Sequence, residues 1–377
     1  ERNLDKYLSV SKLKEKVGIF YDPNRIDISL LDLFDKHCEF KRPNIAETTY
    51  ELQYRKRILN LLKKCPNDLN QQDKLVQELY KVAPPSMFSK MISRLHNLIK
   101  WAKKRGIIPQ DAKNDFKSLA EDYTKIKPRK KVPQLLKDIP GYYQDPDYKA
   151  FSREEAEIII QAFKDLAEAD FDEAGNRVRS NWKVRRIAMY RYICLLFWTG
   201  CRTGEASALR WKDIAPDCSY IIFSQTYNHR LKILKPLKTE KVGEEDTQSR
   251  KFPCGKKLRN LLQEMKQELG SELNQDDFLF QTSRGTVLTN HNIEFSWLGN
   301  HKGKGEMVSK GVVLKLAEEG KITQYLCNYT TRHTWITQQL IKGVPIVNIA
   351  KLAGNSPETI LKHYAGYQPL IELADEI

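Results

Sequence analysis

The chain has 377 residues, which predicts two or three domains. Its longest apolar run, Ile193 to Trp198, is far shorter than the roughly 18 residues that a membrane-spanning helix needs, so the sequence argues against a membrane protein. A formal net charge of +15 and a pI near 9.3 indicate instead an anionic polymer as partner.

Cysteine usage points to a reducing compartment. The seven cysteines are scattered, and no two of them have C-x-x-C spacing. An odd number without such pairs argues against a disulfide framework and against a zinc site. We therefore expect reduced thiols in a cytoplasmic protein.

The first predicted domain is helical. Residues 1–45 have no clear pattern and stay unassigned, whereas the stretch from Glu47 to Gly106 has helical periodicity. Its apolar stripes are Tyr50, Tyr54, Ile58 and Leu61 or Leu62, and then Met91, Leu95, Leu98 and Ala102. Gly106 is a suitable C-terminal stop. We predict a helical domain over residues 46–124.

A basic linker follows, over residues 125–149. It begins with Lys125-Ile-Lys-Pro-Arg-Lys-Lys-Val-Pro133, which is charged and broken by proline. Between Lys81 and Val132 there are 14 basic and four acidic residues, a net +10. A solvated helix face is the simpler explanation, but solvation does not require so few acids. A flexible basic strap could follow a duplex backbone and give salt-sensitive affinity.

The second predicted domain covers residues 150–377. Ser152 and Glu155 form a capping-box signature, and a helix from Trp182 to Trp198 ends at Gly200. Strands at 220–223, 231–234 and 250–252 predict a small three-stranded antiparallel sheet. Further helices are predicted at 256–269, 306–319, 329–342, 345–353 and 357–365. Glycines occupy C-terminal cap positions: Gly270, Gly320, Gly343 and Gly354. The whole chain is thus predicted to be mainly α.

Three separated segments of this domain carry a specific pattern. They are Thr199-Gly-Cys-Arg-Thr-Gly-Glu205 with Leu209-Arg-Trp-Lys-Asp-Ile214, then Tyr329-Thr-Thr-Arg-His-Thr-Trp335, then Leu352-Ala-Gly-Asn-Ser-Pro-Glu-Thr359 ending in Lys362-His-Tyr364. Their order, and the nine-residue step from Asn355 to Tyr364, resemble the tyrosine recombinase family, also called phage integrases. The resemblance covers about residues 150–367. A weaker one extends over residues 47–109, which are similar to the family's core DNA-binding domain.

The resemblance implies a phosphate clamp made of Arg202 and Arg332. A guanidinium group suits this role because its planar fork binds two oxygens and stays charged. Two such groups can neutralise charge developing on a five-coordinate phosphorus, so the resemblance implies neither a metal nor another cofactor. Glu205 follows Arg202 by one helical turn and resembles the acidic residue that orients this arginine.

The resemblance also implies a general acid and a nucleophile. Lys238 is similar to the family's hairpin lysine, which protonates the departing 5′ oxygen, although Lys235 and Lys241 are nearby alternatives. Tyr364 would be the nucleophile that forms a 3′-phosphotyrosine. Tyr367 is its competitor, which the family spacing disfavours.

Two positions depart from the family pattern. Tyr329 stands where the family usually has histidine, and Asn355 where it has histidine or tryptophan. Both side chains can donate hydrogen bonds to phosphate, but neither replaces imidazole as a base, so the acceptor of the Tyr364 proton stays open. His333 and His363 should each point elsewhere on their helices, and we favour a supporting role in packing for both. Some cyanobacterial recombinases that excise DNA elements resemble this chain in the Tyr substitution.

The resemblance implies a site-specific recombinase of the bacterial cytoplasm. The two domains would form a C-shaped clamp on double-stranded DNA, and four protomers would exchange strands through a Holliday junction. The expected DNA-binding residues are Lys100, Lys103, Lys104, Arg105, Lys127, Arg129, Lys130 and Lys131. Two alternatives remain: a DNA-binding architectural or regulatory protein that has lost the chemistry, and a type IB topoisomerase.

Overall fold

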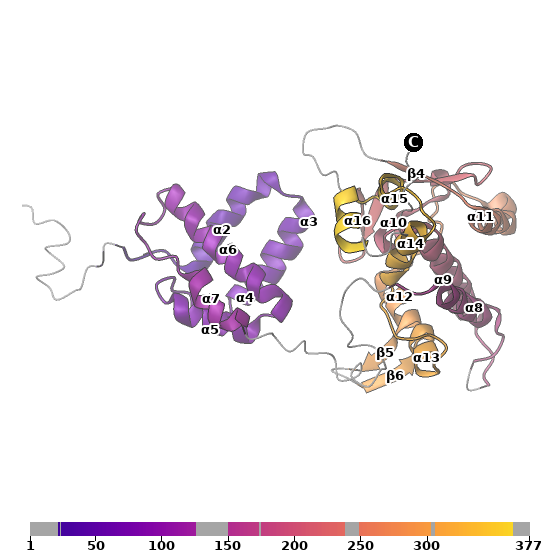
Figure 1. Cartoon of the computed structure of the whole chain (residues 1–377), viewed down its shortest axis with the longest axis horizontal. Coiled ribbons are helices and arrows are strands. Elements are labelled where there is room, and N and C mark those ends of the chain that lie inside the picture. The colour runs from indigo at the N-terminus through magenta and orange to yellow at the C-terminus, as the bar shows by residue number, and fades with distance from the viewer. Residues whose placement is uncertain are drawn as a thin grey trace, which may run out of the picture. The chain divides into compact units, whose positions relative to one another are not determined.

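The computed structural model describes residues 22, 24–125, 150–172, 175–237, 249–302 and 306–364. The chain divides into two compact units, Glu1–Lys131 and Val132–Ile377. Both are built mainly from helices (Figure 1), as predicted. From residue 126 onward the predicted basic linker lies outside the described residues.

Helices make up the described part of the first unit. They are α2 (Leu30–Lys41), η2 (Arg42–Asn44), α3 (Glu47–Thr49), the π-helical η3 (Tyr50–Ile58), α4 (Leu59–Leu62), α5 (Gln72–Val82), α6 (Pro85–Lys104) and α7 (Phe116–Lys125).

The predicted apolar stripes form the core of this unit. Met91, Leu95, Leu98 and Ala102 of α6 are each at most 2% exposed. The helix ends as expected, with Gly106 at a φ of +64° just beyond it. The stretch that the sequence left unassigned contains α2, which buries its apolar face in the same core.

The second unit is a larger helical domain. Its helices are α8 (Arg153–Glu168), α9 (Ser180–Thr199), α10 (Thr203–Ala208), η5 (Trp211–Asp213), α11 (Lys256–Leu269), η6 (Gly270–Glu272), α12 (Asn290–Trp297), α13 (Val312–Glu318), α14 (Thr330–Ile341), α15 (Ile346–Ala353) and α16 (Pro357–Tyr364). The capping box predicted at Ser152 is present, since its hydroxyl accepts from the Glu155 N–H at 3.1 Å and the Glu155 carboxylate accepts from the Ser152 N–H at 2.8 Å.

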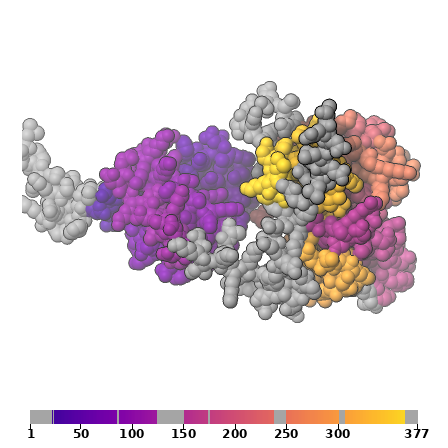
Figure 2. All heavy atoms as spheres, in the orientation of Figure 1, coloured from indigo at the N-terminus to yellow at the C-terminus, as the bar shows by residue number. Residues whose placement is uncertain are grey.

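Helix α9 is the centre of this domain. The apolar run that is too short for a membrane helix is buried from Ile193 to Phe197. Helices α8, α11 and α14 contact α9, which explains why it is apolar on more than one face. Helix α16 lies at the surface, in the yellow part of Figure 2: its Leu361 is 46% exposed, while Ile360 and Tyr364 turn inward.

The predicted three-stranded sheet is instead a pair of two-stranded antiparallel sheets. Strand β1 (Tyr220–Phe223) pairs with β4 (Arg250–Pro253), and β2 (Gln225–Asn228) pairs with β3 (Ile233–Pro236). Ser224 alone separates β1 from β2, so one extended segment changes partner at this residue. The carbonyl of Ser224 accepts a hydrogen bond from the Leu237 N–H at 3.3 Å.

The helix predicted over Glu306–Glu319 is wrong in its first part. Strand β6 (Glu306–Lys310) pairs antiparallel with β5 (Gly299–Lys302), and α13 begins only at Val312. Gly311 permits the close turn between them, because a Cβ there would lie 2.5 Å from the carbonyl carbon of Trp297. The error arises because strand pairing depends on a partner that local periodicity does not reveal.

Candidate active site

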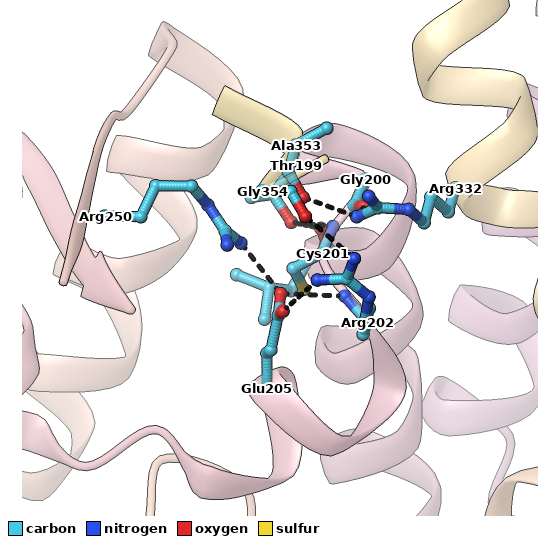
Figure 3. Close-up of polar contacts among 10 residues, drawn as sticks. Thr199, Gly200, Cys201, Arg202, Glu205, Arg250, Arg332, Ala353 and Gly354 are labelled. Atoms are coloured by element: carbon cyan, nitrogen blue, oxygen red, sulfur yellow. Dashed lines mark hydrogen bonds and ion pairs between the residues drawn. The ribbon is translucent and has the colours of Figure 1, made fainter. Parts of the chain in front are cut away.

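Arg202 lies at the start of α10, next to the turn that ends α9. Gly200 makes this turn with a φ of +61°, and a Cβ there would lie 2.8 Å from the Trp335 ring. The two ends of the Arg202 guanidinium have different partners. Nη1 donates to Oε1 of Glu205 at 2.8 Å, and Nη2 donates to the carbonyl of Gly354 at 2.7 Å. Arg202 is therefore fixed between two turns that are far apart in sequence (Figure 3).

Arg332, on α14, reaches the same two turns from the other side (Figure 3). Its Nη1 donates to the carbonyls of Gly200 at 2.8 Å and Ala353 at 2.6 Å. The residue is 2% exposed, and its Nη2 is buried without a hydrogen-bond partner among the described residues. Burial, and then the nearby charge of Arg202, lower the pKa of Arg332. The two predicted clamp arginines are thus neighbours, and the Nη2 amino group of Arg332 is left to donate.

Glu205 is buried between Arg202 and a third arginine that the sequence analysis missed. Arg250 of β4 donates from Nη2 to Oε2 of Glu205 at 2.8 Å, and its guanidinium lies 4.5 Å from the centroid of the Phe223 ring. Burial alone would raise the pKa of Glu205, but Arg250 and then Arg202 outweigh burial and hold the pKa below its usual value. The Glu205 carboxylate is therefore ionised, and it pairs with both Arg202 and Arg250.

A sequence signal for Arg250 existed. It alternates with Phe252 on one face of the strand, and both side chains are buried while Lys251 between them is exposed. A basic residue on the buried face of a strand needs a carboxylate partner.

Gly354 holds the second turn close to these arginines. It has a φ of +65° after α15, and a Cβ there would lie 2.3 Å from Nη1 of Arg250 and 3.6 Å from Nη1 of Arg202. Any side chain would displace the Arg250 guanidinium, so this glycine has a role in the site beyond capping the helix.

Tyr364, the last described residue, lies in α16 and is 3% exposed. Its hydroxyl is hydrogen-bonded to Nδ1 of His333, the residue that follows Arg332 on α14. The expectation that His333 points elsewhere on its helix is therefore wrong, because its ring meets Tyr364 of α16. Burial, and then the charges of Arg332 and His363, lower the pKa of His333 to about 4.

Tyr329, at the start of α14, lies between Arg202 and His333. Its ring packs edge-on against His333, with centroids 5.3 Å apart. Its phenol, together with Glu205, offsets desolvation and keeps the pKa of Arg202 above the usual value. Asn355 lies in the turn beyond Gly354, where its N–H donates to the carbonyl of Ala350 at 3.0 Å.

Lys238 and its alternative Lys241 lie outside the described residues, so their roles stay predictions. The hairpin that leads to Lys238 packs against α10, where a Cβ on Gly204 would lie 2.5 Å from Oγ1 of Thr226. Lys235, the third candidate, lies on β3 opposite Thr226.

The predicted DNA-binding residues of the first unit lie around the C-terminal end of α6. Lys100, Lys104 and Arg105 are exposed, and Lys103 is half-buried. The Arg105 guanidinium lies 4.7 Å from the centroid of the Phe40 ring. Lys127, Arg129, Lys130 and Lys131 lie outside the described residues.

Within the described residues, no group of three or more His, Cys, Asp or Glu side chains is placed to hold a metal ion. In the same part of the chain, no helix has both the length and the apolar character needed to cross a membrane.

Comparison with known proteins places this domain in a family. A model of the phage integrase family matches residues 164–369. The Tn1549 transposon integrase in complex with circular intermediate DNA is similar in fold, with a TM-score of 0.59 and 16% identity over 92% of this chain and 96% of that chain. A lambda integrase dimer bound to a COC′ core site has a TM-score of 0.50 and 12% identity over 99% of this chain and 86% of that chain. No curated protein matches the sequence. Because the family model matches more than half of the residues, the chain belongs to the phage integrase family, the tyrosine recombinases.

Proposed function

We propose that the chain is a site-specific DNA recombinase that cleaves and rejoins duplex DNA through a 3′-phosphotyrosine at Tyr364. One observation carries the proposal. Arg202 and Arg332 converge on the turns at Gly200 and Gly354, and Arg332 keeps a buried N–H group without a partner among the described residues.

The paired arginines suit a phosphodiester. Two neighbouring guanidinium groups repel each other, and the effect of Arg202 on the pKa of Arg332 reflects this repulsion. An anion between them relieves it, and each planar fork can donate to non-bridging phosphate oxygens. Charge on these oxygens grows in the transition state, so the clamp stabilises the transition state more than the bound substrate. The arginines supply this charge, so the proposed chemistry needs neither metal nor ATP.

In the proposed reaction the Tyr364 oxygen attacks phosphorus and the bond to the 5′ oxygen breaks. Lys238 protonates the departing 5′ oxygen, Glu205 holds Arg202 in position, and Tyr329 and Asn355 donate hydrogen bonds to phosphate oxygens. The phosphotyrosine keeps the energy of the broken bond, so a 5′ hydroxyl of another strand can reverse the step.

Double-stranded DNA is the proposed substrate. The Tn1549 and lambda integrases with similar folds were each solved with DNA, and this chain has a net charge of +15. We propose that the helical first domain and the basic linker, with the residues named above, hold the duplex in a C-shaped clamp. Four protomers would exchange strands through a Holliday junction.

A trapping experiment tests this function. The full chain is incubated with a library of nicked, 5′-labelled duplexes of randomised sequence, in which cleavage next to the nick releases a short fragment and prevents rejoining. We expect a labelled protein adduct that survives denaturation, that is retained in Tyr367→Phe and that is lost in Tyr364→Phe. Sequencing the adducts identifies the cleaved site.

The other outcomes separate the alternatives. Adducts formed equally on all sequences, with relaxation of any supercoiled plasmid, would indicate a type IB topoisomerase. DNA binding without an adduct would indicate an architectural or regulatory protein, which the departures at Tyr329 and Asn355 favour.

A further inference from the structure

The hydroxyl of Tyr364 already has an imidazole partner, although the two usual histidine positions of the site hold Tyr329 and Asn355. Nδ1 of His333 is hydrogen-bonded to the phenol oxygen, and the two ring centroids are 5.6 Å apart. Both side chains belong to one compact unit, and the phenol is buried. A phenol attacks phosphorus efficiently only if a positioned group takes its proton.

We infer that His333 accepts the phenolic proton of Tyr364 at Nδ1 as strand cleavage begins, an inference that rests on the proposed function. In this step the O–H bond of Tyr364 breaks and its proton moves to Nδ1. The phenol oxygen bonds to phosphorus, the bond from phosphorus to the 5′ oxygen breaks, and Lys238 protonates that oxygen. In rejoining, a 5′ hydroxyl gives its proton to Lys238 as it attacks phosphorus, the bond from phosphorus to the phenol oxygen breaks, and His333 returns its proton to that oxygen.

The surroundings of His333 keep its imidazole ring neutral, the form that can accept a proton. Burial, and then Arg332 and His363, lower its pKa to about 4, so the imidazole is neutral at pH 7. With the ring proton on Nε2, Nδ1 is an acceptor. The free phenol titrates near about 10, so complete transfer before attack would be strongly unfavourable. The proton therefore moves as the new bond to phosphorus forms.

Substrate binding strengthens this base. A phosphodiester next to Arg332 brings a negative charge that offsets the positive charges around the ring, and this favours the protonated imidazole. Within the described residues, the charged and titratable groups around the ring include Arg332 and Tyr329 from the α14 side, and His363 and Tyr364 from α16. The edge-on ring of Tyr329 also restricts the imidazole to the orientation that meets Tyr364.

A pH profile of cleavage tests the inference. Single-turnover cleavage of a nicked duplex selected from the library is measured from pH 6 to pH 9 for the wild type, His333→Gln and His363→Gln. The wild-type rate should be nearly independent of pH. At pH 7, His333→Gln should be slower by about 10² to 10⁴-fold, and its rate should rise about tenfold per pH unit because hydroxide replaces the base. His363→Gln removes the neighbouring imidazole and should keep the flat profile.

A modified substrate distinguishes loss of the proposed general base, His333, from loss of the proposed general acid, Lys238. When sulfur replaces the bridging 5′ oxygen, the leaving group no longer needs a proton, so cleavage by Lys238→Ala should recover. Cleavage by His333→Gln should not recover. For His333→Ala, added imidazole should restore part of the rate at pH 7.

Several results would overturn the inference. They are a His333→Gln profile parallel to the wild type, recovery of His333→Gln with the sulfur substrate, or a wild-type rate that itself rises tenfold per pH unit. The last measurement needs no variant, so it decides even if the substitutions prevent folding. A wild type that forms no adduct contradicts the proposed function instead, whereas a normal adduct with equally active His333→Gln removes only the role of His333.

Discussion

Glu205 connects Arg202 to strand β4, since its two carboxylate oxygens accept hydrogen bonds from Arg202 and from Arg250 of that strand. Both partners are needed because the carboxylate is only 1% exposed. A buried charge that loses a partner destabilises a protein far more than an exposed one. Arg250 therefore acts as a positioning residue: it keeps Glu205 ionised, and Glu205 orients Arg202.

Replacing Arg250 by alanine should affect both stability and cleavage. We expect the free energy of unfolding in urea to fall by about 3 kcal/mol, the lower end of the cost of breaking a buried ion pair, and adduct formation to slow at least about tenfold. Arg210→Ala is the matched control, because Arg210 also stacks on a phenylalanine ring, at 5.0 Å from Phe278. Its carboxylate partner Asp276 is exposed, so this control should change both quantities far less. Equal effects of the two variants would refute the positioning role.

The loss in Arg250→Ala should also depend on pH. A carboxyl group whose pKa is lower in the folded protein stabilises it above the unfolded pKa, about 4.3 for glutamate. This contribution disappears as the pH falls through the lower, folded value, and Arg250 is the main charge holding the pKa of Glu205 down. The difference in unfolding free energy between wild type and variant should therefore be largest near pH 7 and shrink below about pH 4. A difference that is constant with pH would contradict this.

At this scale, motif spacing predicted which residues meet in the candidate site better than it predicted their partners. Arg202, Glu205, Arg332 and Tyr364 were recognised from motif spacing, and the structure brings the first three into one hydrogen-bonded cluster. Arg250 was missed because its partner lies 45 residues away. The direction of His333 was mispredicted because helical periodicity gives the direction of a side chain but not the element that it meets.

Two turns with left-handed glycines hold the site together. Gly200 ends α9 and Gly354 ends α15, and the carbonyls at or just before these glycines bind the clamp arginines. The geometry of the clamp thus depends on where two helices stop.

Gly354→Ala should damage the site more than an ordinary capping position would suggest. Gly343→Ala is the matched control: Gly343 has a φ of +73°, but a Cβ there meets nothing within 4 Å. We expect the control to lose about 1 kcal/mol of unfolding free energy, the cost of a left-handed alanine. Gly354→Ala should lose about 2 kcal/mol or more, since contact with Arg250 is added, and its cleavage should fall as well. Unfolding in urea measures the loss of stability, and adduct formation measures the loss of cleavage. Identical losses in the two variants would contradict the close packing at Gly354.

Helices with local signals were predicted well, whereas strands were predicted only in part: β1 and β4 agree with the prediction. The Ser152 capping box, the stop at Gly200 and the helices from α14 to α16 depend on neighbouring residues, and the structure confirms them. Strands β2 and β5 were missed, because each is stabilised by pairing across a turn rather than by its own pattern.

Each of the two units of the chain has its own core, and the basic stretch from Lys81 to Val132 includes the point at which they divide. Clustered charge of this kind binds any duplex by releasing counterions. The proposed function therefore assigns affinity for DNA in general and chemistry at one phosphate to different parts of the chain, and the two should respond to different substitutions.

Replacing Lys127, Arg129, Lys130 and Lys131 by alanine tests this division. Binding to duplexes of any sequence should weaken, and the slope of log affinity against log salt should fall by about 3 to 4 if each residue contacts one phosphate. Exchanging the three lysines for arginine preserves the charge and should preserve the slope. Titration of labelled duplexes at several salt concentrations measures it. If the alanine variant kept the wild-type slope, these residues would lie outside the DNA interface.

Nη2 of Arg332, which has no hydrogen-bond partner among the described residues, has a consequence for the protein as a whole. Burying such a donor without an acceptor lowers the free energy of unfolding by about 1 to 3 kcal/mol. This is a sizeable fraction of the unfolding free energy of an ordinary domain. Under the proposed function, a DNA phosphate supplies the acceptor that the described residues of the DNA-free protein do not provide. Under that proposal, affinity for the reacting phosphate and a lower stability of the DNA-free protein have one origin.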